Sequence, residues 1–135
     1  MKVLIVDDFG VVRNWIVTML SDIEGVEVVG QATDAHAAVT AVRSLRPDVV
    51  ILDIDMPHGS GLDVLREIKR SLNTAIVFMF SNMSDPQMRD RCLTAGADFF
   101  FDKTLEATRM IDFVKKLNDQ FVGDRQAVAN QGAQF

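Results

Sequence analysis

The chain has a single cysteine, Cys92, and no long hydrophobic run. One cysteine cannot form an intrachain disulfide, which favours a reducing compartment. The apolar run at the N-terminus is too short for the core of a signal peptide, and two acidic residues end it. No later segment approaches the roughly 20 apolar residues of a membrane helix. These absences predict a soluble, cytoplasmic protein that does not insert into membranes.

An excess of positive charge is also missing. The 135 residues include 14 Lys and Arg against 19 Asp and Glu, giving a formal net charge of −5. Because binding to DNA or RNA relies on a basic surface, this balance argues against a nucleic-acid partner. The chain is 48% hydrophobic and 24% charged, which is typical of a globular protein, and its length suits one domain.

Short apolar runs alternate along the chain with segments of helical spacing. Each run has the length of a strand and is mostly apolar on both faces, as expected for a parallel sheet covered on both sides. The five runs are Val3–Val6, Val26–Val29, Val49–Leu52, Ala75–Phe80 and Phe99–Phe101. The helical stripes between and after them are Val12–Ile23, Ala38–Leu45, Leu65–Leu72, Met88–Ala95 and Met110–Phe121, the last within a helix expected over about Glu106–Phe121.

Five strand–helix pairs in strict alternation predict a doubly wound α/β domain. Its parallel sheet would have right-handed crossovers and the flavodoxin-like strand order 2-1-3-4-5. We expect this domain to occupy residues 1–121. Hydrophobic periodicity is lost from about Gly123, so residues 122–135 are expected to form a flexible C-terminal tail.

Polar residues follow four of the apolar runs and would meet at one edge of the sheet. Asp7 and Asp8 follow the first run, Asp53 the third, Ser81 the fourth, and Lys103 comes just after the fifth. Ligands of such sheets bind outside the carboxyl ends of the strands. Two carboxylates about 4 Å apart repel by roughly 4 kcal/mol at an effective dielectric constant near 20, so three in one crevice require a cation. Oxygen ligands favour Mg²⁺ as that cation.

These motifs resemble the receiver domains of two-component response regulators over about Lys2 to Leu117. The resemblance rests on the order of five features along the chain. They are the pair Asp7-Asp8, the D-x-x-M-P-x-x-x-G pattern from Asp53 to Gly61, Ser81, the A-G-A-D segment from Ala95, and Lys103.

The resemblance implies a phosphorylation site with bound Mg²⁺. Asp53 would be the phosphoacceptor. Asp7, Asp8 and Asp53 would bind the metal, together with the backbone carbonyl of Asp55. Formation of an acyl phosphate on a carboxylate needs in-line placement and charge neutralisation more than covalent assistance, which suits this set of groups.

The remaining residues would read out the phosphoryl group. By the same resemblance, Lys103 would contact that group and Ser81 would hydrogen-bond it. Movement of Ser81 would be coupled to an inward turn of the aromatic residue three positions before the lysine, Phe100. Packing in the core is an equally weighted alternative for Phe100, because it lies in a run of three phenylalanines.

The family also implies the partners. The phosphoryl donor would be a phosphohistidine on a sensor histidine kinase or a histidine phosphotransfer protein. The chain would catalyse only its own phosphorylation and slow dephosphorylation, so it would not be an enzyme with an external substrate. As a chemotaxis-like, stand-alone receiver it would act through contact with an unknown downstream protein, or serve as a relay intermediate.

Two positions depart from the family pattern. Thr104 follows the lysine where proline is usual, and a cis bond before threonine would cost roughly 2.5–4 kcal/mol, so a trans bond and a differently shaped loop are expected. By the same resemblance, Asp55 and Met83 occupy the two positions that tune water access to the acyl phosphate in this family. Because the Met83 side chain cannot orient a water molecule, we expect slow dephosphorylation.

Two other functions compete with this interpretation. A haloacid-dehalogenase-like phosphatase also uses an Asp-x-Asp motif, here Asp53-x-Asp55, but places it on its first strand and ahead of the other acidic residues. A receiver-like scaffold that acts without phosphorylation typically lacks the acidic pair, the acceptor or the lysine, and this chain has all of them.

Overall fold

The structure is a computed structural model that describes the backbone of residues 1–132 and the side chains of residues 1–124. Its elements in chain order are β1 (Lys2–Val6), α1 (Gly10–Ser21), β2 (Glu27–Ala32), α2 (Ala35–Leu45), β3 (Val49–Leu52), β4 (Asp55–Met56), β5 (Gly59–Ser60), α3 (Gly61–Ser71), β6 (Ile76–Ser81), α4 (Pro86–Thr94), β7 (Phe99–Asp102) and α5 (Ala107–Gly132). The five predicted strands are all present, within a few residues of their expected bounds.

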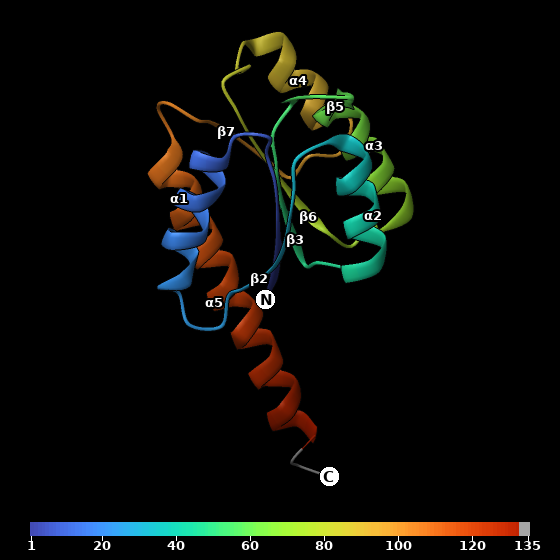
Figure 1. The fold of residues 1–135 in the computed structure, drawn as a ribbon. Coiled ribbons are helices and arrows are strands. Elements are labelled where there is room, and N and C mark those ends of the chain that lie inside the picture. The colour runs from blue at the N-terminus through green and yellow to red at the C-terminus, as the bar shows by residue number, and fades with distance from the viewer. Residues whose placement is uncertain (133–135) are drawn as a thin grey trace.

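The main sheet has five strands in the order β2-β1-β3-β6-β7, and every neighbouring pair is parallel. When the short β4–β5 hairpin is set aside, this order is the predicted 2-1-3-4-5. In Figure 1, α1 and α5 cover one face of the sheet, while α2 and α3 cover the other. The doubly wound fold class is therefore confirmed.

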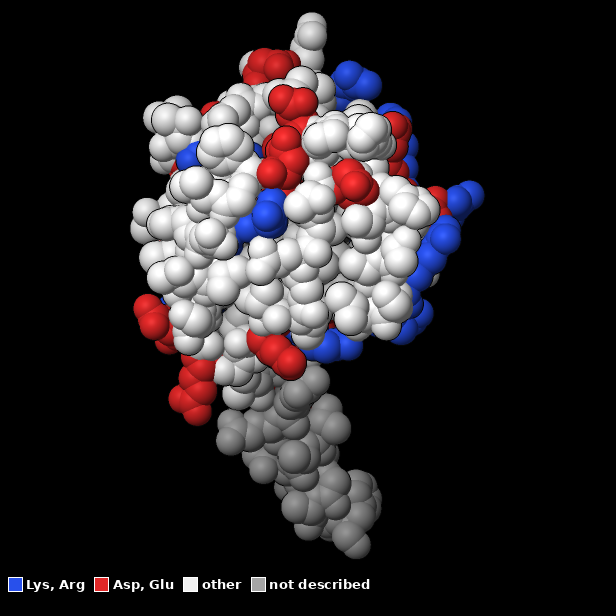
Figure 2. Space-filling model, viewed as in Figure 1, with Lys and Arg blue, Asp and Glu red and all other residues white. Residues whose placement is uncertain are grey.

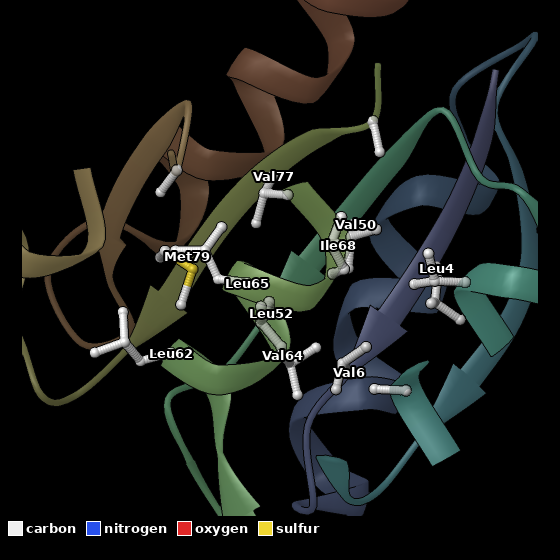
Figure 3. Close-up of a cluster of buried hydrophobic side chains, with 14 of the residues drawn as sticks. Leu4, Val6, Val50, Leu52, Leu62, Val64, Leu65, Ile68, Val77 and Met79 are labelled. Atoms are coloured by element: carbon white, nitrogen blue, oxygen red, sulfur yellow. The ribbon is translucent and has the colours of Figure 1, made fainter. Parts of the chain in front are cut away.

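The two faces of the sheet build two separate hydrophobic cores. Side chains alternate along each strand, so Leu4 and Val6 of β1 enter one core while Val3 and Ile5 enter the other. Figure 3 shows part of the first core, where strand residues face α3. The residues labelled there are Leu4, Val6, Val50, Leu52, Leu62, Val64, Leu65, Ile68, Val77 and Met79.

A two-stranded antiparallel hairpin, β4–β5, was not expected from the sequence. It pairs Asp55 with Ser60 and turns through Pro57 and His58, whose φ of 58° lies in the left-handed region. Strands of two residues are too short to show hydrophobic periodicity, so the sequence pattern does not predict them. The hairpin connects the end of β3 to the start of α3 and so borders the expected site.

Two helices differ from their predicted extents. The α1 helix ends at Ser21, so Ile23 lies beyond it, and Leu20 rather than Met19 joins Ile16 among its buried residues. The α5 helix continues to Gly132, well past the predicted end at Phe121. The backbone of residues 122–132 is thus helical, whereas the flexibility expected of this tail stays a prediction. Residues 133–135 of the tail lie outside the described residues.

The α4 helix, at Pro86–Thr94, contains most of the predicted Met88–Ala95 stripe and has clear end signals. The Asp85 carboxylate accepts a hydrogen bond from the Met88 N–H at 3.0 Å, and Pro86 occupies the first turn. Gly96 follows the helix with a φ of +111°, which glycine adopts without strain. Among the described residues, no helix combines the length and the apolar character that crossing a membrane requires.

Candidate functional site

The carboxyl ends of β1 and β3 bring three aspartates together. One carboxylate oxygen from each of Asp7, Asp8 and Asp53 lies within 4.8 Å of the others. Asp7 and Asp53 are buried, at 2% and 4% exposure, whereas Asp8 faces solvent. Figure 2 shows acidic side chains gathered at the upper part of the molecule, toward which β1 runs in Figure 1. Oxygen ligands with one open side suit a hard cation such as Mg²⁺.

Lys103 joins the same cluster from the loop after β7. Its Nζ lies 2.6 Å from Asp7 Oδ2 and 3.1 Å from Asp53 Oδ2, and its side chain is only 13% exposed. The ammonium group therefore partly neutralises both buried carboxylates. The pair with Asp7 is the shorter of the two, a contact that the sequence interpretation did not include.

The pKa values of the buried groups follow from this arrangement. Burial raises the pKa of the Asp53 carboxyl above its ordinary value; Lys103 lowers it in part, and the neighbouring Asp7 carboxylate raises it again. For Lys103, burial alone would lower the ammonium pKa, but the hydrogen bonds and charges of Asp7 and Asp53 outweigh burial and raise it. The site thus holds excess negative charge that a divalent cation would stabilise.

Removing the Asp53 charge should stabilise the metal-free protein. A carboxyl group whose pKa is raised by folding favours the folded state at low pH, and that contribution is lost as pH rises through the folded-state pKa. Asp53→Asn should therefore increase the free energy of unfolding at pH 7, and the gain should shrink toward pH 4. Urea unfolding of both proteins in chelator-treated buffer measures this difference. A gain that is equal at both pH values would contradict it.

Two hydrogen bonds, one to its side chain and one to its backbone, hold Asp7 in place. Its Oδ1 accepts a hydrogen bond from the Phe9 N–H at 2.9 Å, and its carbonyl oxygen accepts one from Arg13 Nη1 at 2.7 Å. Arg13 also donates through Nε to Gln31 of β2 at 3.1 Å. Sequence reasoning missed Arg13, because an arginine in the first turns of a helix carries no distinguishing pattern. Its contacts connect α1 to β2 across the end of β1.

The first residue of α3, Gly61, packs directly on the backbone of Asp53. The Gly61 N–H donates to the Ile54 carbonyl at 2.8 Å, and a β-carbon at Gly61 would lie 1.9 Å from the Asp53 carbonyl oxygen. Only glycine permits this approach. Asp55, whose carbonyl the sequence assigned to the metal, lies exposed at the rim, and its N–H approaches Asp53 Oδ1 at 3.4 Å.

Ser81 and Met83 line the cavity above Asp53. Ser81 ends β6, and its buried Oγ accepts a hydrogen bond from the Met83 N–H at 3.1 Å. The cavity has a volume of about 350 Å³ and is open to solvent. Its lining residues are Asp8, Phe9, Val12, Asp53, Asp55, Ser81, Asn82, Met83 and Lys103.

Phe100 points into the core rather than outward. The ring is 9% exposed and packs in the hydrophobic cluster beneath α3 and α4. The Arg89 guanidinium covers it, with Cζ 4.9 Å from the ring centroid. The inward position is thus present while Asp53 is paired with Lys103.

Hydrogen bonds to Asp102 and Asn82 hold the loop after Lys103. The described residues contain no cis peptide bond, so the bond before Thr104 is trans, as expected. The Asp102 carboxylate accepts hydrogen bonds from the N–H groups of Thr104 and Leu105 at 2.8 and 2.9 Å. Thr104 Oγ1 lies 3.1 Å from Asn82 Oδ1, which connects this loop to the one after β6. Threonine in place of proline thus supplies an N–H and a hydroxyl that the loop uses.

Comparison with known proteins identifies a consistent group of relatives. The family model for "Response regulator receiver domain" matches residues 3–115. Response regulator GacA of Pseudomonas aeruginosa is 36% identical over 124 residues, which cover 92% of this chain and 56% of that protein. Chemotaxis protein CheY of Thermotoga maritima is 35% identical over 120 residues, covering 87% of this chain and 97% of that protein. This chain therefore spans just over half the length of its GacA relatives.

Solved structures show the same similarity in three dimensions. A chain in the crystal structure of the CheX-CheY-BeF3-Mg+2 complex from Borrelia burgdorferi superimposes with a TM-score of 0.80 at 29% sequence identity. The match covers 87% of this chain and 88% of that one. The sheet and the helices around it thus follow an arrangement seen in an experimentally determined structure.

Proposed function

This chain belongs to the response regulator receiver domain family, and from that premise we propose that it is a phosphorylation-dependent switch of a two-component pathway. The observation that carries the proposal is the cluster of Asp7, Asp8 and Asp53 with Lys103 at the carboxyl edge of the sheet. Family membership separates the chain from haloacid-dehalogenase-like phosphatases, whose motif order it also lacks.

Asp53 is the proposed phosphoacceptor. One of its carboxylate oxygens attacks the phosphorus of a phosphohistidine, the phosphorus–nitrogen bond breaks, and the imidazole leaves with the bonding electrons. Lys103, already 3.1 Å from Asp53, stays beside the added negative charge. Asp7, Asp8 and Asp53 are the side chains that would hold Mg²⁺, which would neutralise charge on the transferring group, and we assign the Asp55 carbonyl to the same metal.

Ser81 is proposed to detect the product. An aspartyl phosphate adds about −1.5 to −2 charges and strong acceptor oxygens at the floor of the cavity. The Ser81 hydroxyl, now bonded by the Met83 N–H, can rotate to donate to one of those oxygens. The loop that follows Ser81 would then move toward Asp53 and alter the surface formed by α4, β7 and α5.

Binding of a phosphoryl analogue tests this proposal. Beryllofluoride with Mg²⁺ should bind the parent saturably and shift the amide signals of Asp53, Ser81 and Lys103 in nitrogen-15 NMR spectra. Asp53→Asn should abolish these shifts, because the carboxylate that coordinates beryllium is lost. Shifts in the parent that persist in Asp53→Asn would locate binding elsewhere, and no shifts at all would favour a scaffold that works without phosphorylation.

An exposed apolar surface beside the site fits a protein donor. Val11 is 72% and Leu105 84% exposed, and Phe9 lies exposed next to Asp8. A groove of about 260 Å³ runs between α1 and the start of α5, lined by Val11, Val12, Trp15, Phe80, Lys103 and Ala107. Exposed apolar side chains concentrated around a reactive group indicate a docking surface. We assign it to the kinase or phosphotransfer protein that carries the phosphohistidine.

A charged substitution on this surface should slow phosphorylation by a protein donor but not by a small-molecule donor. Val11→Glu should slow transfer from the cognate phosphohistidine protein at least about tenfold, since it places an unpaired charge in an apolar interface. Phosphorylation by acetyl phosphate should stay within about twofold, because a small donor needs no docking surface. Transfer rates with both donors measure the effect. Equal slowing with both would show that Val11 acts on the site itself.

Met83 should slow hydrolysis of the acyl phosphate. Its exposed thioether lines the cavity and offers only a weak acceptor to an attacking water. Met83→Glu or Met83→Gln should shorten the half-life of the phosphorylated protein by several-fold up to about 100-fold, which reaches the lower end of the effect of a positioned general base. Decay of the phosphorylated species followed by intact mass measures this. An unchanged or longer half-life would contradict the assigned role.

The output of the switch is proposed to be contact with a downstream protein. The relatives include a chemotaxis CheY of similar length and longer response regulators such as GacA. The structure of a Borrelia burgdorferi CheY bound to CheX provides a solved example of a receiver in a protein complex. For this chain, we assign the contact to the surface formed by α4, β7 and α5, because Phe100 lies in β7 and the loop after Ser81 leads to α4.

A further inference from the structure

Arg89 makes three different contacts on the face between α4 and α5. Its Nε donates to the Ser84 carbonyl at 3.0 Å, its Nη2 lies 2.9 Å from Glu106 Oε1, and its Cζ lies 4.9 Å from the Phe100 ring centroid. The guanidinium therefore lies over the ring while its Nε and Nη2 atoms are both held by hydrogen bonds. Arg89 is partly buried, with 35% of its side chain exposed.

Its partners are themselves anchored to β7. Ser84 Oγ donates a hydrogen bond to the Asp102 carboxylate, and Glu106 Oε1 accepts one from the Asp102 N–H at 3.1 Å. The bond to Ser84 is the largest of several contacts that lower the Asp102 pKa, and the bond to Arg89 is the largest that lowers the Glu106 pKa. Both carboxylates are thus stabilised as anions. Arg89, Ser84, Asp102 and Glu106 together form what we call the Arg89 cluster.

The Arg89 cluster connects the segments expected to move. Ser84 lies three residues after Ser81 in the loop that leads to α4, whereas Asp102 ends β7 one residue before Lys103. A shift of the Ser81 loop toward Asp53 would therefore be transmitted through Ser84 to Arg89, and from Arg89 to the ring of Phe100. No separate path through the core is needed.

We propose that Arg89 is a positioning residue that holds Phe100 in its buried position before phosphorylation, so that the face between α4 and α5 is already biased toward the signalling arrangement. The inference rests on the proposed function and concerns the regulation of the same site. Phenylalanine has no hydroxyl to draw it into water, and a guanidinium over its ring adds a favourable cation–π contact. The outward position would lose both burial and that contact.

A bias of this kind has a defined consequence for phosphorylation. If Phe100 is held inward, a larger fraction of the unphosphorylated protein already has the signalling arrangement. Phosphorylation then has fewer molecules to convert, and the apparent affinity for the phosphoryl group lies closer to the intrinsic affinity. Loss of Arg89 should release the ring and weaken binding of a phosphoryl analogue. Arg89 would thus support the site through Ser84, Glu106 and Phe100, without touching the reacting atoms.

The ring position can be measured without any phosphoryl donor. In protein labelled with carbon-13 phenylalanine, Phe100 signals are assigned with Phe100→Leu, and their relaxation by a soluble paramagnetic probe reports exposure. Arg89→Ala and Arg89→Gln should increase that relaxation at least about twofold. Arg91→Ala removes an exposed arginine from the same helix and should leave it unchanged. Relaxation of Phe100 that is equal in the parent and both Arg89 variants would overturn the proposal.

Affinity for beryllofluoride with Mg²⁺ tests the functional half of the proposal. Arg89→Ala should weaken binding about two- to tenfold, the range expected from loss of one cation–π contact, while Arg91→Ala matches the parent. Unchanged or tighter binding in Arg89→Ala would overturn the coupling. Absence of binding in the parent would instead count against the proposed function, and the ring measurement would still decide whether Arg89 positions Phe100.

Discussion

Replacing Lys103 by methionine is expected to lower the free energy of unfolding by about 3–5 kcal/mol in metal-free buffer at neutral pH, the range for breaking a buried ion pair on one side. Methionine keeps much of the side-chain length but leaves the buried carboxylates of Asp7 and Asp53 without their cation. Urea unfolding monitored by circular dichroism measures the loss. Addition of Mg²⁺ should restore more stability to this variant than to the parent, because the metal replaces the missing charge.

A matched lysine provides the control for this prediction. Lys115 is exposed on α5, and Lys115→Met should change stability by no more than about 0.5 kcal/mol. A Lys103→Met protein as stable as Lys115→Met in chelator-treated buffer would show that the carboxylates are neutralised in another way. Such a result would remove the electrostatic reason for a metal at this edge.

Replacing Gly61 by alanine is expected to destabilise the protein by about 3 kcal/mol or more, at the upper end of the range for overpacking. The new β-carbon would lie 1.9 Å from the Asp53 carbonyl oxygen and 2.7 Å from the Ile54 Cα, and both are backbone atoms that cannot rotate away. The start of α3 or the chain just after β3 must therefore shift. Since Asp53 directly follows β3, binding of beryllofluoride with Mg²⁺ should fall together with stability.

Replacement of Gly123 by alanine should stabilise the protein, in contrast to the same replacement at Gly61. It lies within α5 with no atom within 4 Å of its potential β-carbon, so Gly123→Ala should stabilise the helix by about 0.5–1 kcal/mol. Thermal unfolding of both variants against the parent gives the comparison. A Gly61→Ala protein that matches the parent in stability and in beryllofluoride binding would contradict the close packing of Gly61 on Asp53.

The sheet and the position of the site were predictable because their signals are local. Apolar runs such as Val3–Val6 and Val49–Leu52 identify strands, and alternation with helices fixes parallel pairing. Once the strands are parallel, the residues that follow them must meet at one edge. The proximity of Asp7, Asp8 and Asp53 therefore followed from topology, without any knowledge of side-chain geometry.

What could not be predicted depends on contacts between residues distant in the sequence. The Arg89 contacts with Phe100 and Glu106 carry no motif, since an arginine on a polar helix face is usually solvated. The 2.6 Å pair between Lys103 and Asp7 depends on which carboxylate lies nearer, which spacing does not reveal. The extension of α5 past Phe121 was missed because a segment without an apolar stripe gives no periodic signal.

The most direct test of the central claim is the intact mass of the parent and of Asp53→Asn after incubation with Mg²⁺ and acetyl phosphate. We expect a single phosphoryl adduct on the parent, removed by hydroxylamine as an acyl phosphate is, and no adduct on Asp53→Asn or on the parent without Mg²⁺. An adduct of the same yield on Asp53→Asn, or none on the parent while Mg²⁺ binding is seen, would contradict the assignment of Asp53 as the phosphoacceptor.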